Sequence, residues 1–270
     1  MMKGSRVSGF ALSRVTLLFT VLMLSACVTV VETPFNKKAS EDKAVENYTQ
    51  LGLGYLQQGR TDLSRQRLRK ALSIKEDYAP AHDAMGLLWQ TEGELDLAEE
   101  AFEKAISLDD DYSLAKHHLG RLYSQLKRYD DAEDYLQEAA SNRFYDNRAA
   151  AYNDLALNHY RAGKADQAVA DYREALRIAP YNVDALVNIS TLLFEAQNYG
   201  ESQKFFNRFD RLVKRQQTRH SAHSLWLGIK LATIALDTKR TIELATELKQ
   251  NFPDSNEYNQ YQQSLADASR

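Results

Sequence analysis

Residues 79–112 read APAHDAMGLLWQTEGELDLAEEAFEKAISLDDDY, and this stretch of 34 residues decides the fold. Its first half contains the pair Met85-Gly86, followed three residues later by the bulky Trp89. Gly93 then interrupts the pattern, at a place where a helix end tolerates a left-handed residue best. The stretch therefore begins with a predicted helix that ends at a turn.

The second half of the same stretch repeats small and large side chains at helical spacing. Ala98, Phe102 and Ala105 stand at positions i, i+4 and i+7, which share one face of a helix. Small residues on that face let a second helix approach, while the large side chain fills the space between the two. The stretch therefore predicts a helix-turn-helix unit.

The same pattern recurs along most of the chain. Equivalent windows begin at residues 45, 113, 149 and 183, so the period is 34 residues with two extra residues after the third copy. The equivalents of Met85-Gly86 are Leu51-Gly52, Leu119-Gly120, Leu155-Ala156 and Ile189-Ser190. A worn sixth copy, 222–255, follows an insertion of five residues, as expected of a terminal repeat.

A period of 34 residues with these small and large positions resembles the tetratricopeptide repeat. The resemblance implies an all-α superhelix of about six helix-turn-helix repeats, in which the first helix of each repeat lines a concave face. We expect the domain to span residues 45–270, including a C-terminal tail. The expected repeats are 45–78, 79–112, 113–146, 149–182, 183–216 and 222–255.

The first 26 residues are typical of an export signal. Three basic residues precede Val15–Leu24, an uncharged run of ten residues that is too short to span a bilayer. Leu24-Ser25-Ala26-Cys27 follows and resembles the lipobox of bacterial lipoproteins, which implies a lipid on Cys27, the only cysteine. Val28 stands where an aspartate favours retention in the inner membrane, so we expect the outer membrane, facing the periplasm. The alternatives are a cleaved signal with an incidental cysteine and a short buried helix.

Residues 27–44 are interpreted as the lipidated N-terminus and a flexible tether. From Thr29 to Lys43 no helical periodicity is visible, and Pro34 interrupts the segment. Lipid chains on Cys27 would hold the protein on a membrane, because each buried methylene contributes about 0.8 kcal/mol.

The charge balance argues against nucleic acid as the main partner. The full chain carries a formal net charge of −3, and removal of residues 1–26 takes away three basic residues and no acid, leaving about −6. Such a chain has no electrostatic attraction to phosphate backbones. The basic side chains between 208 and 219 are interpreted as a solvated helix face.

The sequence contains no pattern typical of a catalytic or metal site. Phosphate-binding loops, GxSxG and HExxH are all absent. His117 and His118 are adjacent and point to different sides of a helix, and we expect His220 and His223 to lack an acid that completes a metal site. We therefore expect a binding protein with no catalytic residue, no cofactor besides the lipid and no small-molecule substrate.

The repeat family also implies which side chains face a partner. Its inward positions, carried onto this chain, are Thr49, Leu53, Leu56, Leu87, Arg121, Asn153, Leu157, Tyr160 and Phe194. Leu53, Leu56 and Leu87 would form an apolar strip suited to an amphipathic partner helix. The alternative is that these leucines pack under the tether or against the neighbouring repeat.

Four segments resemble the type IV pilus biogenesis lipoproteins, the PilF/PilW family of pilotins. They are YTQLGLGYLQQG (48–59), LRKAL (68–72), LGIKLA (227–232) and FPDSNEYNQY (252–261). The resemblance implies that the repeats bind subunits of the outer-membrane secretin and promote their localisation and multimerisation. A second interpretation is a general envelope adaptor that scaffolds peptidoglycan hydrolases or outer-membrane assembly factors.

Overall fold

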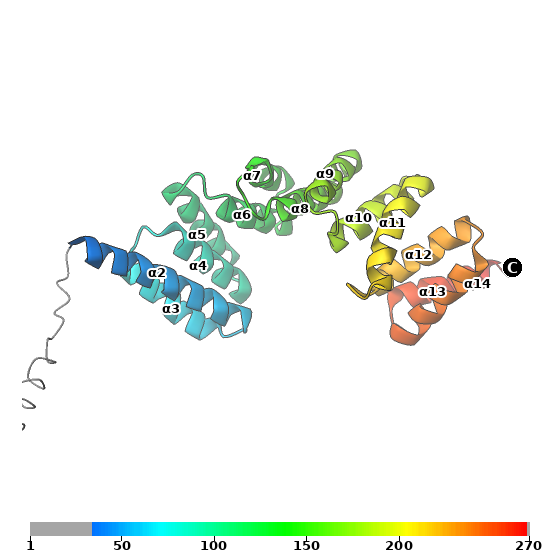
Figure 1. Ribbon diagram of the computed structural model, residues 1–270, viewed down its shortest axis with the longest axis horizontal. Coiled ribbons are helices and arrows are strands. Elements are labelled where there is room, and N and C mark those ends of the chain that lie inside the picture. Colours follow the sequence, from blue (N-terminus) through cyan, green and yellow to red (C-terminus); the bar gives the residue numbers. More distant parts are fainter. Residues whose placement is uncertain (1–33, 269–270) are drawn as a thin grey trace, which may run out of the picture. The chain divides into compact units, whose positions relative to one another are not determined.

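The computed structural model describes residues 34–268, and every regular element in this part of the chain is an α-helix. In chain order the helices are α2 (Pro34–Gln57), α3 (Thr61–Ile74), α4 (Ala79–Glu92), α5 (Leu95–Leu108), α6 (Ser113–Gln125), α7 (Tyr129–Ser141), α8 (Arg148–Arg161), α9 (Ala165–Ile178), α10 (Val183–Glu195), α11 (Tyr199–Lys214), α12 (Ala222–Ile234), α13 (Thr238–Asn251) and α14 (Asn256–Ala268) (Figure 1). None of these helices has the length and apolar character needed to cross a membrane. The predicted signal peptide and Cys27 lie outside the described residues.

Consecutive helices pair, and each expected repeat window holds one pair. Helix α4 packs on α5, α6 on α7, α8 on α9, α10 on α11 and α12 on α13, while α2 meets α3 where Gly52 lies against Leu68 (Figure 1). Each pair also packs on the next one along the chain. The predicted fold class, an all-α stack of helix-turn-helix repeats, is confirmed.

The predicted small and large positions meet inside each pair. A methyl group built on Gly86 would lie 2.5 Å from the ring of Phe102, and one on Gly120 would lie 2.7 Å from Leu136. Phe102 and Leu136 have no exposed surface. The two helices of a repeat therefore approach closely because the first helix has no side chain at this point and the second fills the space.

We expect Gly86→Ala to lower the free energy of unfolding by about 1–2 kcal/mol, because the added methyl group must displace the buried ring of Phe102. The loss stays moderate because the fold accepts Ala156 at the same position of repeat four, in one core cluster with Tyr172. Urea denaturation followed by circular dichroism measures the change. Gly54→Ala is the matched control, since no atom lies within 4 Å of its added methyl group. Equal losses in both variants would contradict the packing argument.

The turns inside the pairs use a left-handed residue, as predicted at Gly93, and Gly59 and Gly163 adopt the same conformation. Gly93 has φ 84° and ends α4, and its backbone N–H donates to the carbonyl of Gln90. Other pairs place a non-glycine residue in the same conformation, including Lys127 at φ 62° and Leu236 at φ 56°. The turn geometry is therefore kept even where the sequence lacks its glycine signal.

The prediction of an irregular tether up to residue 44 is wrong for the part that the structure describes. Helix α2 begins at Pro34, and residues 38–43 are helical with exposed side chains. Proline suits the first turn of a helix, and the residues that follow are mostly good helix formers. No periodicity is visible there because no face of this segment is buried.

The residues after the sixth repeat, expected as a tail, form helix α14. Tyr258 and Tyr261 pack against the core cluster of α12 and α13, which contains Leu225 and Leu248. The ring of Tyr261 also meets that of Trp226 edge to face, at 6.2 Å between centroids. The spacing of three residues between the two tyrosines is the helical signal for this element.

Candidate functional site

The predicted apolar strip is largely used for packing between repeats. Leu53 and Leu56 are half-buried against the cluster of Leu68, Met85 and Leu88. Leu87 packs against a different cluster, that of α5, α6 and α7. The structure therefore shows the alternative arrangement for these leucines, in which they contact the neighbouring repeat and only part of each remains accessible.

Thr49 does not lie on an open surface. Its side chain is 2% exposed, and its hydroxyl donates a hydrogen bond of 2.8 Å to the carbonyl oxygen of Val45. The predicted inward position is therefore wrong for Thr49, because in the first repeat this side chain is satisfied within its own helix.

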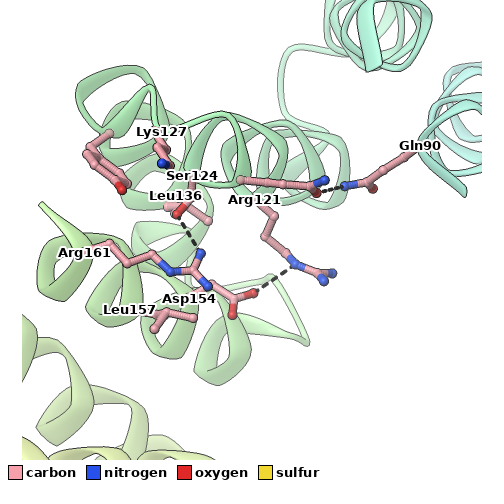
Figure 2. Close-up of a pocket in the computed structure, with 10 residues that line it drawn as sticks. Gln90, Arg121, Ser124, Lys127, Leu136, Asp154, Leu157 and Arg161 are labelled. Carbon is pink, nitrogen blue, oxygen red and sulfur yellow. Dashed lines mark hydrogen bonds and ion pairs between the residues drawn. The ribbon is translucent and has the colours of Figure 1, made fainter. Parts of the chain in front are cut away.

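Repeats three and four, with the end of α4, form a polar pocket that contains two of the predicted residues, Arg121 and Leu157. Its volume is about 400 Å³. The pocket is lined by Gln90, Arg121, Ser124, Gln125, Lys127, Tyr129, Leu136, Asp154, Leu157 and Arg161 (Figure 2). Three of these side chains are basic and one is acidic. The pocket is therefore positively charged although the chain as a whole is acidic.

Hydrogen bonds join the helices that form this pocket. The amide of Gln90 donates to Gln125 at 3.0 Å and links repeat two to repeat three. The guanidinium of Arg161 donates to the hydroxyl of Ser124 at 3.4 Å, which links repeat four to repeat three (Figure 2). These contacts fix the positions of the helices and leave most of the surface of Arg121 exposed to solvent.

Asp154 connects the pocket to a buried network. Its carboxylate lies 3.4 Å from Nε of Arg121 (Figure 2). The same carboxylate lies 2.8 Å from Nε2 of His117. The other ring nitrogen of His117 lies 2.9 Å from the hydroxyl of Tyr145, whose pKa is raised to about 12 by burial. A neutral His117 satisfies both contacts when its proton is on Nε2, because Tyr145 then donates to Nδ1. The network orients Asp154 toward Arg121.

The second histidine, His118, joins repeat three to repeat two. Nδ1 of His118 lies 2.7 Å from the carboxylate of Asp83, which is 3% exposed. His117 and His118 therefore point to different partners, Asp154 in repeat four and Asp83 in repeat two. The two rings nevertheless lie side by side, with centroids 6.3 Å apart and an interplanar angle of 19°, so the prediction that they point to different sides of the helix is wrong.

The remaining predicted residues are spread over repeats four and five. Asn153 is half-buried, and its side-chain oxygen has no hydrogen-bond partner among residues 34–268. Tyr160 is exposed, its hydroxyl donates to Glu195 at 3.2 Å, and its pKa is raised by burial and then by the Glu195 charge. Phe194 is half-buried and lies 4.5 Å from the ammonium of Lys230, measured from its ring centroid. The structure does not bring these three into the pocket of Arg121.

Sequence reasoning missed several exposed or half-buried residues of the same face. Lys127 lies in a turn, and Asp154 directly follows the predicted inward residue Asn153. The inward positions of the repeat family therefore include neither Lys127 nor Asp154. Counted from residue 222, Trp226, Lys230 and Ile234 are the fifth, ninth and thirteenth residues of repeat six, and the family's inward positions include all three. The family's inward positions would have identified these three residues if they had also been applied to the sixth repeat, residues 222–255.

His220 and His223 have separate partners. Nε2 of His220 lies 3.5 Å from Asp210, contrary to the expectation that no acid lies close by. Asp210 also contacts Lys214 and Arg240, whereas His223 contacts the hydroxyl of Thr191. Within the part of the chain that the structure describes, no three histidine, cysteine or acidic side chains are grouped so that they could hold a metal ion.

Comparison with known proteins gives consistent relatives. The tetratricopeptide-repeat family matches residues 45–78, 79–112, 111–180 and 159–225. The type IV pilus assembly protein PilF of Pseudomonas aeruginosa is 32% identical over 251 residues, which cover 92% of this chain and 98% of that protein.

Two solved structures show the same arrangement of helices. That of Pseudomonas aeruginosa PilF has a TM-score of 0.77 and 32% identity, over 83% of this chain and 99% of the other. That of PilW, a widely conserved type IV pilus biogenesis factor, has a TM-score of 0.70 and 21% identity, over 80% and 97%. The fold, the repeats and the near full-length match to PilF together place the chain in the PilF/PilW family of tetratricopeptide-repeat proteins of type IV pilus biogenesis.

Proposed function

We propose that this protein is a pilotin, an outer-membrane lipoprotein anchored through Cys27. Its repeats bind subunits of the type IV pilus secretin, and the anchor brings those subunits to the outer membrane, where they form multimers. The protein acts as a binding scaffold and performs no catalysis. Joining a membrane anchor to a binding domain raises the effective concentration of the bound subunit at the membrane.

The near full-length similarity to PilF carries this proposal. It extends over 92% of the chain, so it includes segments outside the repeats that share no general repeat pattern. The lipobox-like sequence at 24–27 supports the anchor. The outer-membrane destination rests on Val28, which stands where an aspartate would favour the inner membrane.

The pocket of Arg121, Lys127 and Arg161 is the proposed contact surface for the secretin. Three basic side chains around one carboxylate suit a partner segment with an excess of acidic residues. Leu157 supplies apolar surface within the same pocket. Leu53 and Leu56 are unsuitable for a test by aspartate substitution, because charges there would disturb packing against Leu68, Met85 and Leu88.

Deletion of the gene in its host is expected to abolish the secretin multimer, while the secretin monomer persists. Immunoblots of unboiled membrane samples detect the multimer, because its subunits stay associated when the sample is not heated. A Cys27→Ser copy removes the thiol that carries lipid but leaves the repeats intact, so we expect it to leave the secretin in the inner membrane. Membrane fractionation by density measures this displacement.

The wild-type gene supplied in trans is the control and is expected to restore the multimer. Normal secretin multimers and surface pili in the deletion strain would contradict the pilotin proposal. Co-purification with peptidoglycan hydrolases or outer-membrane assembly factors would then favour the envelope-adaptor interpretation.

A further inference from the structure

A second groove lies at the C-terminal end of the repeats, apart from the pocket of Arg121. Its volume is about 460 Å³, within the range of sites that bind ligands. Residues of α10, α12, α13 and α14 line it, and its apolar surface comes mainly from Phe194, Trp226, Ile234, Tyr261 and Leu265. We call this site the C-terminal groove.

The C-terminal groove forms because α14 lies beside α12, which is the first helix of the last repeat. Trp226, Lys230 and Ile234 are successive turns of one face of α12. Tyr261 of α14 meets Trp226 edge to face, so α14 forms a wall of the groove and does not fill it. Ile234 is 46% exposed and Leu265 is 53% exposed, which leaves apolar side chains at the rim in contact with water.

Among the described residues that line this groove, Lys230 is the only charged one. Its ammonium lies 4.5 Å from the ring centroid of Phe194 and 5.5 Å from that of Trp226. Burial lowers the pKa of Lys230, and the charge of Glu195 opposes this effect. No carboxylate among residues 34–268 forms an ion pair with Lys230, so the ammonium is held over aromatic rings without an anionic partner.

The threonine and serine hydroxyl groups that line the C-terminal groove already donate to nearby backbone carbonyls. Thr233 donates to the carbonyl of Ile229, Thr241 to Asp237, and Ser264 to Tyr261. Among residues 34–268, Lys230 is therefore the charged donor of a mainly apolar surface that also contains the Trp226 indole and the Tyr261 hydroxyl. An extended peptide would leave many of its backbone groups unsatisfied there, whereas a helix satisfies them internally.

We propose that the C-terminal groove binds an amphipathic helix of a partner protein, with its apolar face on Trp226, Ile234 and Leu265 and one acidic side chain on Lys230. The free ammonium and the apolar walls together specify this occupant. The inference does not depend on which protein binds the pocket of Arg121, and its test uses no secretin.

Two synthetic peptides of 18 residues provide the probe. Both form an amphipathic helix with leucines on one face, and one carries Glu where the other carries Gln at the centre of that face. The protein is the full-length chain with Trp89→Phe, so that Trp226 is its only tryptophan and its fluorescence reports on the groove. We expect the Glu peptide to bind about tenfold more tightly than the Gln peptide, because only Glu forms a charge-assisted contact.

Lys230→Met keeps the apolar stem over the two rings and removes the charge, so we expect it to abolish the preference for Glu. Lys239→Met is the matched control, because Lys239 is exposed on α13 and does not line the groove; the preference should persist. Leu265→Glu is a second variant at an exposed position, and we expect it to weaken both peptides about tenfold.

Equal affinities for the two peptides, or an unchanged preference in Lys230→Met, would overturn the proposal. Binding of neither peptide, with no change in Trp226 fluorescence, would overturn it as well. Sedimentation that shows a dimer, lost in Leu265→Glu, would assign the groove to a second copy of this chain instead.

Discussion

Asp210→Asn is expected to lower the free energy of unfolding by about 2–3 kcal/mol at neutral pH. Asp210 is 6% exposed and joins α11 to α13 through an ion pair with Arg240. Lys214 lies 2.8 Å from the same carboxylate and His220 lies 3.5 Å from it. Burial by itself would raise the pKa of Asp210, but hydrogen bonds from His220 and Lys214 and the charge of Arg240 together lower it to about 2.

The sign of this shift determines how stability depends on pH. The folded-state pKa of Asp210 lies below the value of about 3.9 in an unfolded chain, so ionised Asp210 stabilises the folded state above that pH. The contribution disappears as pH falls from about 4 toward 2. The difference in stability between wild type and Asp210→Asn should therefore shrink over that interval, because asparagine does not titrate.

Urea denaturation between pH 7 and pH 3 measures both effects. Asp110→Asn is the control, because Asp110 is exposed in the turn between α5 and α6 and should change stability little. A full-size difference between wild type and Asp210→Asn at the lowest pH would contradict the titration argument. Equal stabilities at pH 7 would show that the contacts of Asp210 do not hold the last two repeats together.

Reversing the charge of the proposed secretin pocket is expected to lower affinity for the secretin by about 10- to 100-fold. The double substitution Arg121→Glu/Arg161→Glu leaves Lys127 as the only basic side chain in the pocket. Arg121 and Arg161 are exposed, so the repeats should stay folded. Titration of the purified periplasmic region of the secretin at two salt concentrations measures the loss, which should be smaller at the higher concentration because exposed charges are screened.

The control carries the same change of net charge elsewhere. Arg69→Glu/Lys104→Glu alters two exposed residues of α3 and α5, the second helices of their repeats, and neither residue lines the pocket. We expect this control to bind nearly as the wild type does. Equal losses in the two double variants would mean that only net charge matters, and the pocket would then not be the contact surface. Loss of the secretin multimer on gene deletion would still support the pilotin proposal in that case.

Much of the fold follows from local spacing. Ala98, Phe102 and Ala105 share one face of a helix whatever surrounds them, and Gly86 marks where the paired helix must approach. The period of 34 residues then places the same contact in successive repeats. The worn sixth copy keeps such a contact, since a methyl group on Gly228 of α12 would lie 2.9 Å from Leu244 of the paired helix α13.

The candidate site can be predicted less completely from the sequence, because the accessibility of its side chains depends on the neighbouring repeat. The family's inward positions place Thr49 and Arg121 on the same face, yet Thr49 is buried and Arg121 is exposed. Leu53 and Leu56 likewise depend on Met85 and Leu88 of the next repeat, which cover them in part. The sequence pattern within one repeat therefore does not show whether these side chains are accessible.

The sequence by itself determined the helices, their pairing and the order of the repeats, because these depend on contacts between residues close in the chain. Only the tertiary structure decided which inward residues remain open and which polar groups converge. Asp154 meets His117 across 37 residues, and Lys230 lies over Phe194 without a carboxylate partner among residues 34–268. Such contacts join different repeats, and their geometry depends on how each helix pair packs on the next.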